Sequence, residues 1–173
     1  MDSITLQSEI DGTISELLEI LSSFTKEQFN IVPFEDSWTA GELAQHLLMS
    51  GSGFLQMING PSKDTERSAD EFAGKIKSTF LNFNTKMKSP EFIVPPKKQY
   101  DKDELVHTLK DVWIGLDHPI QTSDLSKTCT SFELPGFGLL TRYEAVTFVL
   151  YHTQRHIQQL KNIRQKIMEP ADQ

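Results

Sequence analysis

Two histidines, His152 and His156, lie one helical turn apart in a segment near the end of the chain. The other residues on the same line of this segment are apolar: Ala145, Val149, Leu160, Ile163 and Ile167. Side chains four residues apart on a helix lie one above the other, so both imidazoles can reach a single ion. An imidazole buried without a polar partner costs free energy. A divalent metal ion bound by both rings removes that cost, and the spacing indicates such a site.

A third histidine, His46, lies three residues after Leu43 and four before Ser50, and so points inward from a second helical segment. Three neutral imidazoles favour Zn, Ni, Fe or Cu over Mg or Ca. Three protein ligands also leave positions open for water or substrate, as in catalytic sites. Such an ion can lower the pKa of a bound water toward about 7 or hold a thiol as thiolate. The alternative is that each histidine is a hydrogen-bonded core residue, because two histidines four residues apart also occur by chance.

Two glutamates lie on the same segments as these histidines. Glu42 is one turn before His46, and Glu144 is two turns before His152. Either carboxylate can accept a hydrogen bond from an imidazole and so orient it. The regular spacing of each glutamate after a threonine favours the alternative, in which both residues cap helices.

Three further residues are candidates for a role near the histidines or in chemistry. Arg155 adjoins His156 but steps off the face of the histidines, so it either binds a substrate carboxylate or, as we favour, is exposed or ion-paired. Gln159, three residues after His156, is a candidate for a polar role in a pocket. Cys129 has only Lys127 as a basic neighbour in sequence. We do not expect it to be a nucleophile, which needs a lowered pKa and a base.

The remaining histidines and two aromatic residues have simpler interpretations. His107 lies off its apolar stripe and His118 lies near a helix end, so both are expected at the solvated surface. Trp38 and Tyr151 are expected to pack.

Five segments repeat apolar residues with the period of a helix. They cover about residues 4–24, 39–58, 69–88, 101–120 and 141–167. Three begin with the spacing of a capping box, in which a Thr or Asp side chain accepts from the amide three residues on and a Glu reaches back. The pairs are Thr39 with Glu42, Asp101 with Glu104, and Thr141 with Glu144.

The segments between these helices differ in length and composition. Prolines mark a stiff linker after the helix at 69–88, and residues 121–140 form a long connection rich in Ser and Thr. A connection of that length is unusual in a compact domain, and short strands are possible there. We expect an all-α fold: a four-helix bundle with an additional helix at 69–88 and a long loop before the last helix.

The composition is that of an ordinary folded protein, with 24% charged and 38% hydrophobic residues, and 173 residues fit a single domain, 1–173. The net charge of −7 argues against nucleic acid as a partner, and no basic stripe is expected to offset the acidity. No stretch approaches the roughly 20 apolar residues of a membrane span, and the first residues lack the pattern of a signal peptide. The one cysteine fits a reducing compartment, so we expect a cytoplasmic protein.

Three stretches of the chain resemble the DinB-like superfamily, also called the YfiT-like metal-dependent hydrolases. Residues 38–47, WTAGELAQHL, match the family's pattern of Trp-Ser/Thr, then Glu, then His-Leu. Residues 140–144 resemble the start of its last helix, and residues 152–160 match its H-x-x-x-H-x-x-Q-L signature. The helix at 69–88 with its proline linker departs from the family's pattern.

The resemblance implies a four-helix bundle with an unusual connection order, a metal site made by His46, His152 and His156, and commonly a homodimer. Several members transfer bacillithiol or mycothiol to an electrophile, a related group isomerises maleylpyruvate, and many have no known reaction. We therefore expect a metal-dependent enzyme that joins a low-molecular-weight thiol to a small electrophilic substrate, with Zn, Ni or Fe as the ion. The alternatives are a hydrolase that uses a hydroxide held by the metal, and a non-catalytic, stress-related metal-binding module.

Overall fold

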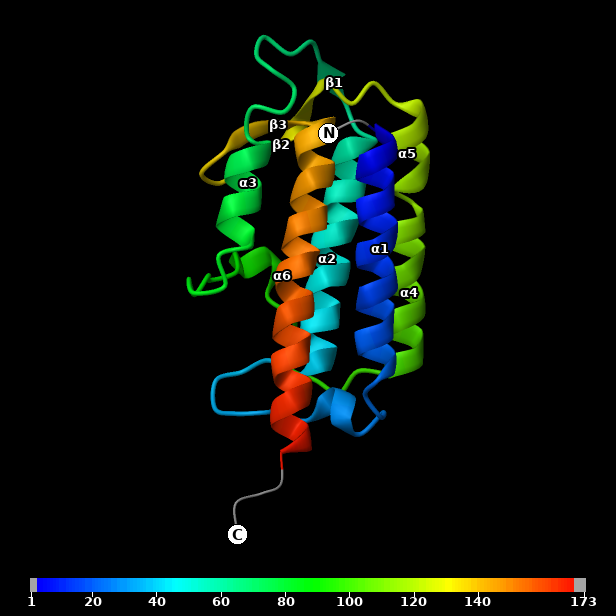
Figure 1. Ribbon diagram of the computed structural model, residues 1–173, viewed down its shortest axis with the longest axis vertical. Helices are drawn as coiled ribbons and strands as arrows, with labels where there is room; N and C mark the ends of the chain where they lie inside the picture. The colour runs from blue at the N-terminus through cyan, green and yellow to red at the C-terminus, as the bar shows by residue number, and fades with distance from the viewer. Residues whose placement is uncertain (1–2, 170–173) are drawn as a thin grey trace.

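Four helices pack side by side as the bundle of the computed structural model, which describes residues 3–169 (Figure 1). They are α1 (Ser3–Ser22), α2 (Ala40–Ile58), α4 (Lys102–Ile114) and α6 (Arg142–Met168). The shorter elements are η1 (Gln28–Asn30), β1 (Ser62–Lys63), α3 (Ala73–Phe80), η2 (Glu91–Ile93), α5 (Asp117–Thr122), β2 (Thr128–Leu134) and β3 (Gly138–Thr141). The expected four-helix bundle is confirmed, whereas both ends of the predicted domain, residues 1–2 and 170–173, lie outside the described residues.

The apolar stripes of these helices meet in one core. Fully buried members include Leu6, Ile10, Leu17 and Leu21 of α1, Leu43 and Leu47 of α2, Leu109 and Trp113 of α4, and Leu160 of α6. Their spacing of three and four residues places them on one face of each helix. Burial of these side chains is the main force that holds the four helices together. Among the described residues, no helix combines the length and the apolar character that crossing a bilayer requires.

The order of connections in the bundle is unusual. In Figure 1, α1 and α6 run downward, while α2 and α4 run upward. The helix α2 packs against both α4 and α6. Because α2 and α4 run in the same direction, these two neighbours are parallel. The chain that leaves the upper end of α2 must therefore return along the bundle before α4 begins. Residues 59–101 make this return: α3 packs against α6, and η2 contacts α2.

The additional helix is shorter than the sequence predicts. The expectation of a helix at 69–88 is wrong at both ends, since α3 covers only Ala73–Phe80. Its buried residues are Ile76 and Phe80, while Phe83 and Met87, which continue the stripe in sequence, are exposed. The helix stops where the Asn82 side chain accepts a hydrogen bond from the Asn84 amide at 3.2 Å. Such local side-chain bonds compete with the helical ladder.

The expected helix at 101–120 is divided in two, α4 and α5. The break falls at Gly115, where an added Cβ would lie 2.8 Å from a methyl carbon of Leu55, and Pro119 cannot donate the next helical hydrogen bond. The capping box predicted at its start is only half formed. Asp101 accepts from the Glu104 amide at 2.9 Å, without the reciprocal bond of a capping box.

The long connection before α6 folds into an antiparallel hairpin. The strands β2 and β3 pair with each other, and β1 pairs with β2, which gives a small sheet in the order β1-β2-β3. Gly136 in the turn and Gly138 at the start of β3 have φ angles of 82° and 76°, which glycine adopts without steric cost. The strand-like pieces that the sequence suggested in this connection are thus present.

Glu144, at the start of α6, joins three parts of the chain. Its carboxylate accepts hydrogen bonds from the amides of Thr141 at 2.9 Å and Phe72 at 2.8 Å, and it forms an ion pair with Arg67 at 2.6 Å. The side chain is fully buried. Residues before α3, the end of β3 and the first turn of α6 therefore meet at this one carboxylate.

We predict that Glu144→Ala destabilises the protein strongly. The change leaves Arg67 without its carboxylate partner, and the buried Thr141 amide and the partly buried Phe72 amide without an acceptor, which costs about 3 kcal/mol or more. Urea unfolding followed by circular dichroism measures the loss. Glu104→Ala, at the exposed half-formed cap of α4, serves as the control and is expected to change little. Equal stability of the two variants would contradict the proposed role of Glu144.

Candidate metal centre

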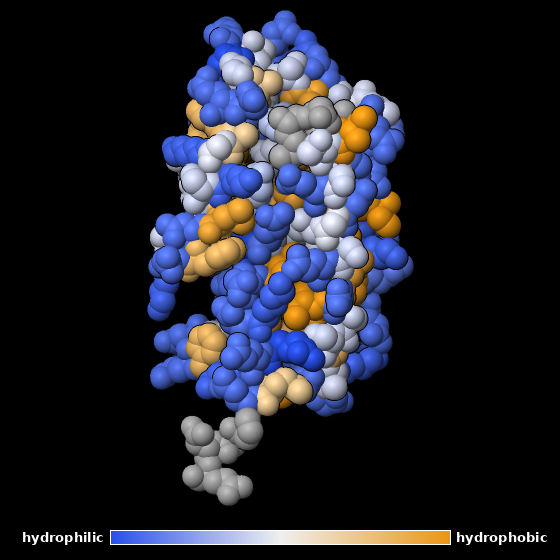
Figure 2. All heavy atoms as spheres, viewed as in Figure 1, coloured by the Kyte–Doolittle hydropathy of each residue, from blue (hydrophilic) through white to orange (hydrophobic). Residues whose placement is uncertain are grey.

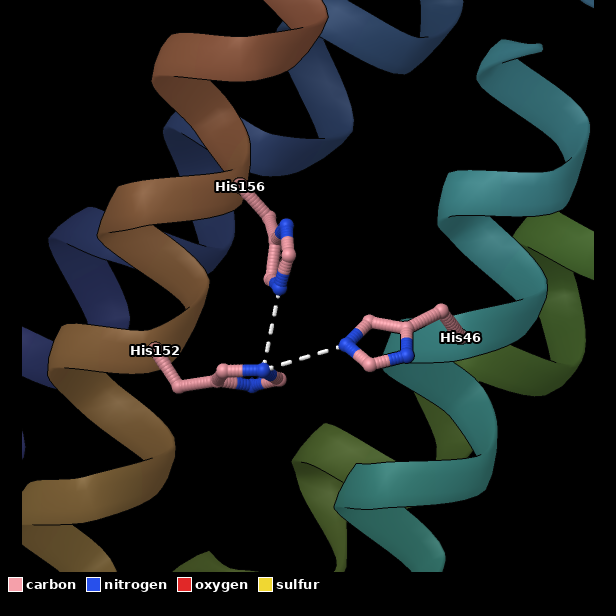
Figure 3. A group of neighbouring side chains, drawn as sticks. All are labelled: His46, His152 and His156. Carbon is pink, nitrogen blue, oxygen red and sulfur yellow. Dashed lines mark hydrogen bonds between the residues drawn. The ribbon is translucent and has the colours of Figure 1, made fainter. Parts of the chain in front are cut away.

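The three predicted ligands meet between two helices. His46 comes from α2, and His152 and His156 come from successive turns of α6 (Figure 3). The Nε2 atom of His152 lies 3.1 Å from Nε2 of His46 and 2.9 Å from Nε2 of His156. His46 is 1% exposed, and the other two are 7% exposed. The structure therefore brings all three rings together with their Nε2 atoms facing one point.

Hydrogen bonds at the opposite ring nitrogens fix two of the rings. His46 Nδ1 lies 2.9 Å from the carbonyl oxygen of Ile93, and His156 Nδ1 is hydrogen-bonded to Oε1 of Gln159. Both partners are acceptors, so each Nδ1 carries the proton and donates it. In a neutral imidazole the other nitrogen then bears a free lone pair. The Nε2 lone pairs of His46 and His156 thus point toward the centre, as metal coordination requires.

His152 completes the arrangement from the other side. Its Nε2 faces the lone pairs of both other histidines, so a proton on this atom satisfies the metal-free site. A metal ion would bind this nitrogen when the His152 ring is in its other neutral tautomer, with the proton on Nδ1. The His152 ring packs against Phe80 and Phe148, with centroids 5.6 and 5.3 Å away, and Trp38 packs against His46 at 5.1 Å. The centre is therefore enclosed mainly by aromatic carbon.

Burial keeps all three histidines neutral. Burial lowers the pKa of His46, and the hydrogen bond to Ile93 raises it by a smaller amount. Burial, followed by the neighbouring imidazoles, places the pKa of His152 well below its ordinary value. Burial lowers the pKa of His156 to about 3. Neutral imidazoles are the form that binds metal ions.

The donor set and its dimensions fit a transition-metal ion. One ligand nitrogen of each histidine lies within 4.8 Å of the others. Nitrogens bound to one tetrahedral zinc at about 2.0–2.1 Å are about 3.3 Å apart. The two separations of 3.1 and 2.9 Å need to open by only a few tenths of an ångström. The three histidines can therefore hold a metal ion by small side-chain rotations.

The two glutamates do not orient the histidines. Glu42 accepts from the Thr39 amide at 2.8 Å in a complete capping box, and Glu144 makes the contacts described above. The interpretation of both residues as helix caps is confirmed. The acceptors that orient the imidazoles are instead the Ile93 carbonyl and Gln159. A carbonyl is present at every residue, so no residue type in the sequence marked the first of these.

Arg155 differs from its expected role. It is only 9% exposed and has no carboxylate partner among the described residues. Its guanidinium donates instead to the carbonyls of Phe80 at 3.2 Å and Asn82 at 2.9 Å, and to that of Thr85. The expectation of an exposed or ion-paired arginine is therefore wrong. Arg155 fastens the chain that follows α3 to the helix that carries two of the histidines.

The other candidate residues lie apart from the site. His107 and His118 are exposed, as expected, and His107 lies 3.6 Å from Asp111. Cys129 is buried, and burial raises the pKa of its thiol, which agrees with its having no role as a nucleophile. Tyr151 is buried, as its packing role predicts.

Comparison with known proteins places the chain in a family. The model of the DinB superfamily matches residues 9–160, so the chain belongs to the DinB superfamily. A solved structure described as TT2238, a four-helix bundle protein, is similar with a TM-score of 0.60 and 14% sequence identity, over 92% of this chain and 98% of that one. This likeness supports the bundle fold. No match was found among curated proteins.

The lowered pKa values predict how stability depends on pH. The unfolded chain protonates its histidines near pH 6.5, whereas the folded, metal-free site does so only at lower pH. The unfolded state therefore binds more protons below pH 6.5, and stability falls as the pH decreases from there toward the folded pKa values. At pH 5.5 the loss is about 1.4 kcal/mol for each strongly shifted histidine.

Thermal unfolding of metal-free protein between pH 7 and 5.5 measures this dependence. The triple variant His46→Phe, His152→Leu, His156→Leu is expected to show a smaller decrease than the wild type. The double variant His107→Ala, His118→Ala, which changes only exposed histidines, should keep the wild-type slope. If the triple variant and the wild type had the same slope, the buried histidines would not be the cause.

Gln159 provides a second prediction. Gln159→Ala removes the acceptor that fixes the His156 ring, and loss of such a partner typically lowers metal affinity at least 10-fold. Competition with a chromophoric zinc chelator measures the affinity. Gln158→Ala, which removes only a hydrogen bond to Asn162 at 3.1 Å, is the control. Equal zinc affinity in the two variants would show that Gln159 does not orient the ligand.

Proposed function

We propose that His46, His152 and His156 hold a divalent transition metal and that the protein is an enzyme that joins a low-molecular-weight thiol to an electrophilic carbon. The observation that carries the proposal is the convergence of three neutral Nε2 atoms with no carboxylate in the group. Membership of the DinB superfamily supports it. Zn, Ni and Fe all suit three imidazole ligands.

The bound metal would supply the positive charge that keeps the sulfur of the thiol deprotonated at neutral pH. The residues of the chain prepare the site for this role. Ile93 and Gln159 hold two imidazoles in the tautomer that presents Nε2. Phe80, Phe148 and Trp38 keep the surroundings apolar, which strengthens electrostatic interactions at the centre.

The transfer itself requires no acid or base from the protein. The sulfur forms a bond to the electrophilic carbon as the bond to the leaving group breaks, and the leaving group departs with that electron pair. The proton of the thiol passes to solvent. A group of three histidines that includes no carboxylate among the described residues is suited to such a reaction, because a soft thiolate is already a strong nucleophile.

The hydrolase alternative has less support from the site. A hydrolase of this kind generally uses a general base within hydrogen-bond reach of the attacking water. Glu42 and Glu144 were the candidates, and both carboxylates are engaged at helix starts. The non-catalytic alternative predicts that loss of the histidines lowers stability and removes no reaction. A small-molecule substrate, a homodimer and a cytoplasmic location remain predictions.

We predict that the purified protein, without affinity histidines, contains about one transition metal ion per chain. Elemental analysis measures it. His46→Ala, His152→Ala and His156→Ala should each reduce the metal content, because each removes one of three ligands. The double variant His107→Ala, His118→Ala should keep it. Absence of metal after incubation with Zn, Ni, Fe and Mn would overturn the proposal.

The loaded protein should then consume thiol in the presence of an electrophile. A screen combines several low-molecular-weight thiols with halogenated or epoxide electrophiles and measures loss of free thiol. Ester and amide substrates, assayed with Glu42→Gln beside the wild type, test hydrolysis in the same preparation. Ester or amide cleavage without thiol consumption would favour the hydrolase. No reaction of either kind would favour the non-catalytic module.

A further inference from the structure

The segment that passes the metal centre on its way to α4 is held to it at three places. We call residues 81–98 the rim segment. Just before it, the Phe80 ring contacts His152. The carbonyls of Asn82 and Thr85 accept hydrogen bonds from Arg155, next to His156. The Ile93 carbonyl accepts from His46. The rim segment therefore contacts His46 directly and is held to α6 by the residue before His156, on its way from the end of α3 to the start of α4 (Figure 1).

The charge of the rim segment is opposite to that of the chain. It contains four lysines and one glutamate, a net charge of +3, in a protein with a net charge of −7. The lysines are Lys86, Lys88, Lys97 and Lys98. The expectation that no basic stripe offsets the acidity is wrong here, because the total charge concealed a local excess.

These lysines have no carboxylate partners in the described part of the chain. Lysines elsewhere do form ion pairs: Lys26 with Asp103, Lys127 with Asp64, Lys161 with Glu16 and Lys166 with Glu169. Within the rim segment, Lys98 lies over the Tyr100 ring at 5.1 Å, and all four lysines are exposed. The main chain anchors the rim segment, so its cationic side chains are left available.

Apolar side chains stand among the lysines. Phe83, Met87, Phe92 and Val94 are between 44% and 63% exposed. The Phe92 ring also meets that of Phe132 on β2, with centroids 6.0 Å apart. Figure 2 shows apolar side chains among hydrophilic ones at the left edge of the molecule, where α3 and the chain after it lie in Figure 1. Exposed apolar and cationic groups together suit a ligand with both an anionic and an apolar part.

We propose that the rim segment binds the anionic group of a substrate that also has an apolar part, beside the metal centre. This inference rests on the proposed function. It adds that one of the two substrates bears a carboxylate, phosphate or sulfonate. The anionic group belongs to the thiol or to the electrophile, and the experiment separates the two. Attachment of the rim segment to His46 and to Arg155 favours a small substrate over a membrane surface, because a ligand held there is next to the metal centre.

The first arm of the test uses thiols that differ in charge. Mercaptoethanol is neutral, whereas mercaptosuccinate carries two carboxylates. Each is titrated into protein loaded with cobalt(II), and the visible absorption of the cobalt reports thiol binding without turnover. The variant Lys86→Glu, Lys88→Glu reverses two charges of the rim segment. The control Lys63→Glu, Lys110→Glu makes the same change of net charge on β1 and α4, at two exposed lysines that form no ion pair with another described residue.

The second arm uses electrophiles that differ in charge, with mercaptoethanol as the thiol. Chlorodinitrobenzene is neutral and chlorodinitrobenzoate is anionic. In both, the sulfur bonds to the ring carbon, chloride leaves with the electron pair of the carbon–chlorine bond, and the thiol proton passes to solvent. The value of kcat/KM is compared between wild type, rim variant and control at low and at physiological ionic strength.

We expect the rim variant to lower either the affinity for mercaptosuccinate or the kcat/KM for chlorodinitrobenzoate roughly tenfold at low ionic strength, with a smaller effect at physiological salt. The affinity for mercaptoethanol and the kcat/KM for chlorodinitrobenzene should stay unchanged. A loss for mercaptosuccinate assigns the anionic group to the thiol, and a loss for chlorodinitrobenzoate assigns it to the electrophile. Equal values for rim variant and control with every ligand overturn this inference and leave the proposed function intact.

Two other outcomes also decide the matter. If neither thiol alters the cobalt absorption of the wild type, the proposed function fails, and this inference fails with it. If the rim variant loses binding to phosphatidylserine vesicles in a sedimentation assay while its ligand affinities equal those of the control, the rim segment is a membrane-facing surface. That result also overturns the inference.

Discussion

The parallel direction of α2 and α4 is the constraint on which the arrangement of the site depends. Neighbouring helices that run the same way cannot be joined by a short loop, so the chain must return along the bundle between them. The return in this protein passes over the contact between α2 and α6, where the histidines are. The connection thus supplies the Ile93 carbonyl, the Phe80 ring and the carbonyls bound by Arg155. The topology, as well as the helices, builds the metal centre.

The sequence predicted the parts that depend on periodic side chains. The long helices, the inward histidines and the complete caps at Thr39 and Thr141 follow from spacing alone, because burial and capping act on residue types. The extent of α3 did not follow, since the exposed Phe83 and Met87 imitate a buried stripe. The orienting role of the Ile93 carbonyl was not predictable either, because contacts to main-chain atoms across the fold leave no mark on residue type.

Arg155 and Glu144 bind the connection between α2 and α4 to α6 in two different ways. Glu144 accepts from main-chain amides and pairs with Arg67, so an anion at the start of the helix holds the chain before α3. Arg155 donates to carbonyls, so a cation further along the helix holds the chain after α3. Both are buried charges that are compensated by hydrogen bonds, as stability requires. The short α3 is thus fastened at both ends to the helix that bears two of the histidines.

The use of main-chain carbonyls to hold the segment after α3 has a consequence for diversification. The acceptor for His46 is the main-chain carbonyl of residue 93. A substitution of Ile93 keeps this acceptor as long as it does not displace the backbone. The same holds at Asn82 and Thr85, whose carbonyls meet Arg155. The side chains of Thr85 and Ile93 can therefore vary while the metal ligands keep their orientation, whereas Asn82 also uses its side chain at the end of α3. Sequence variation at these positions would change the surface of the rim segment and leave the main-chain acceptors beside the metal centre in place.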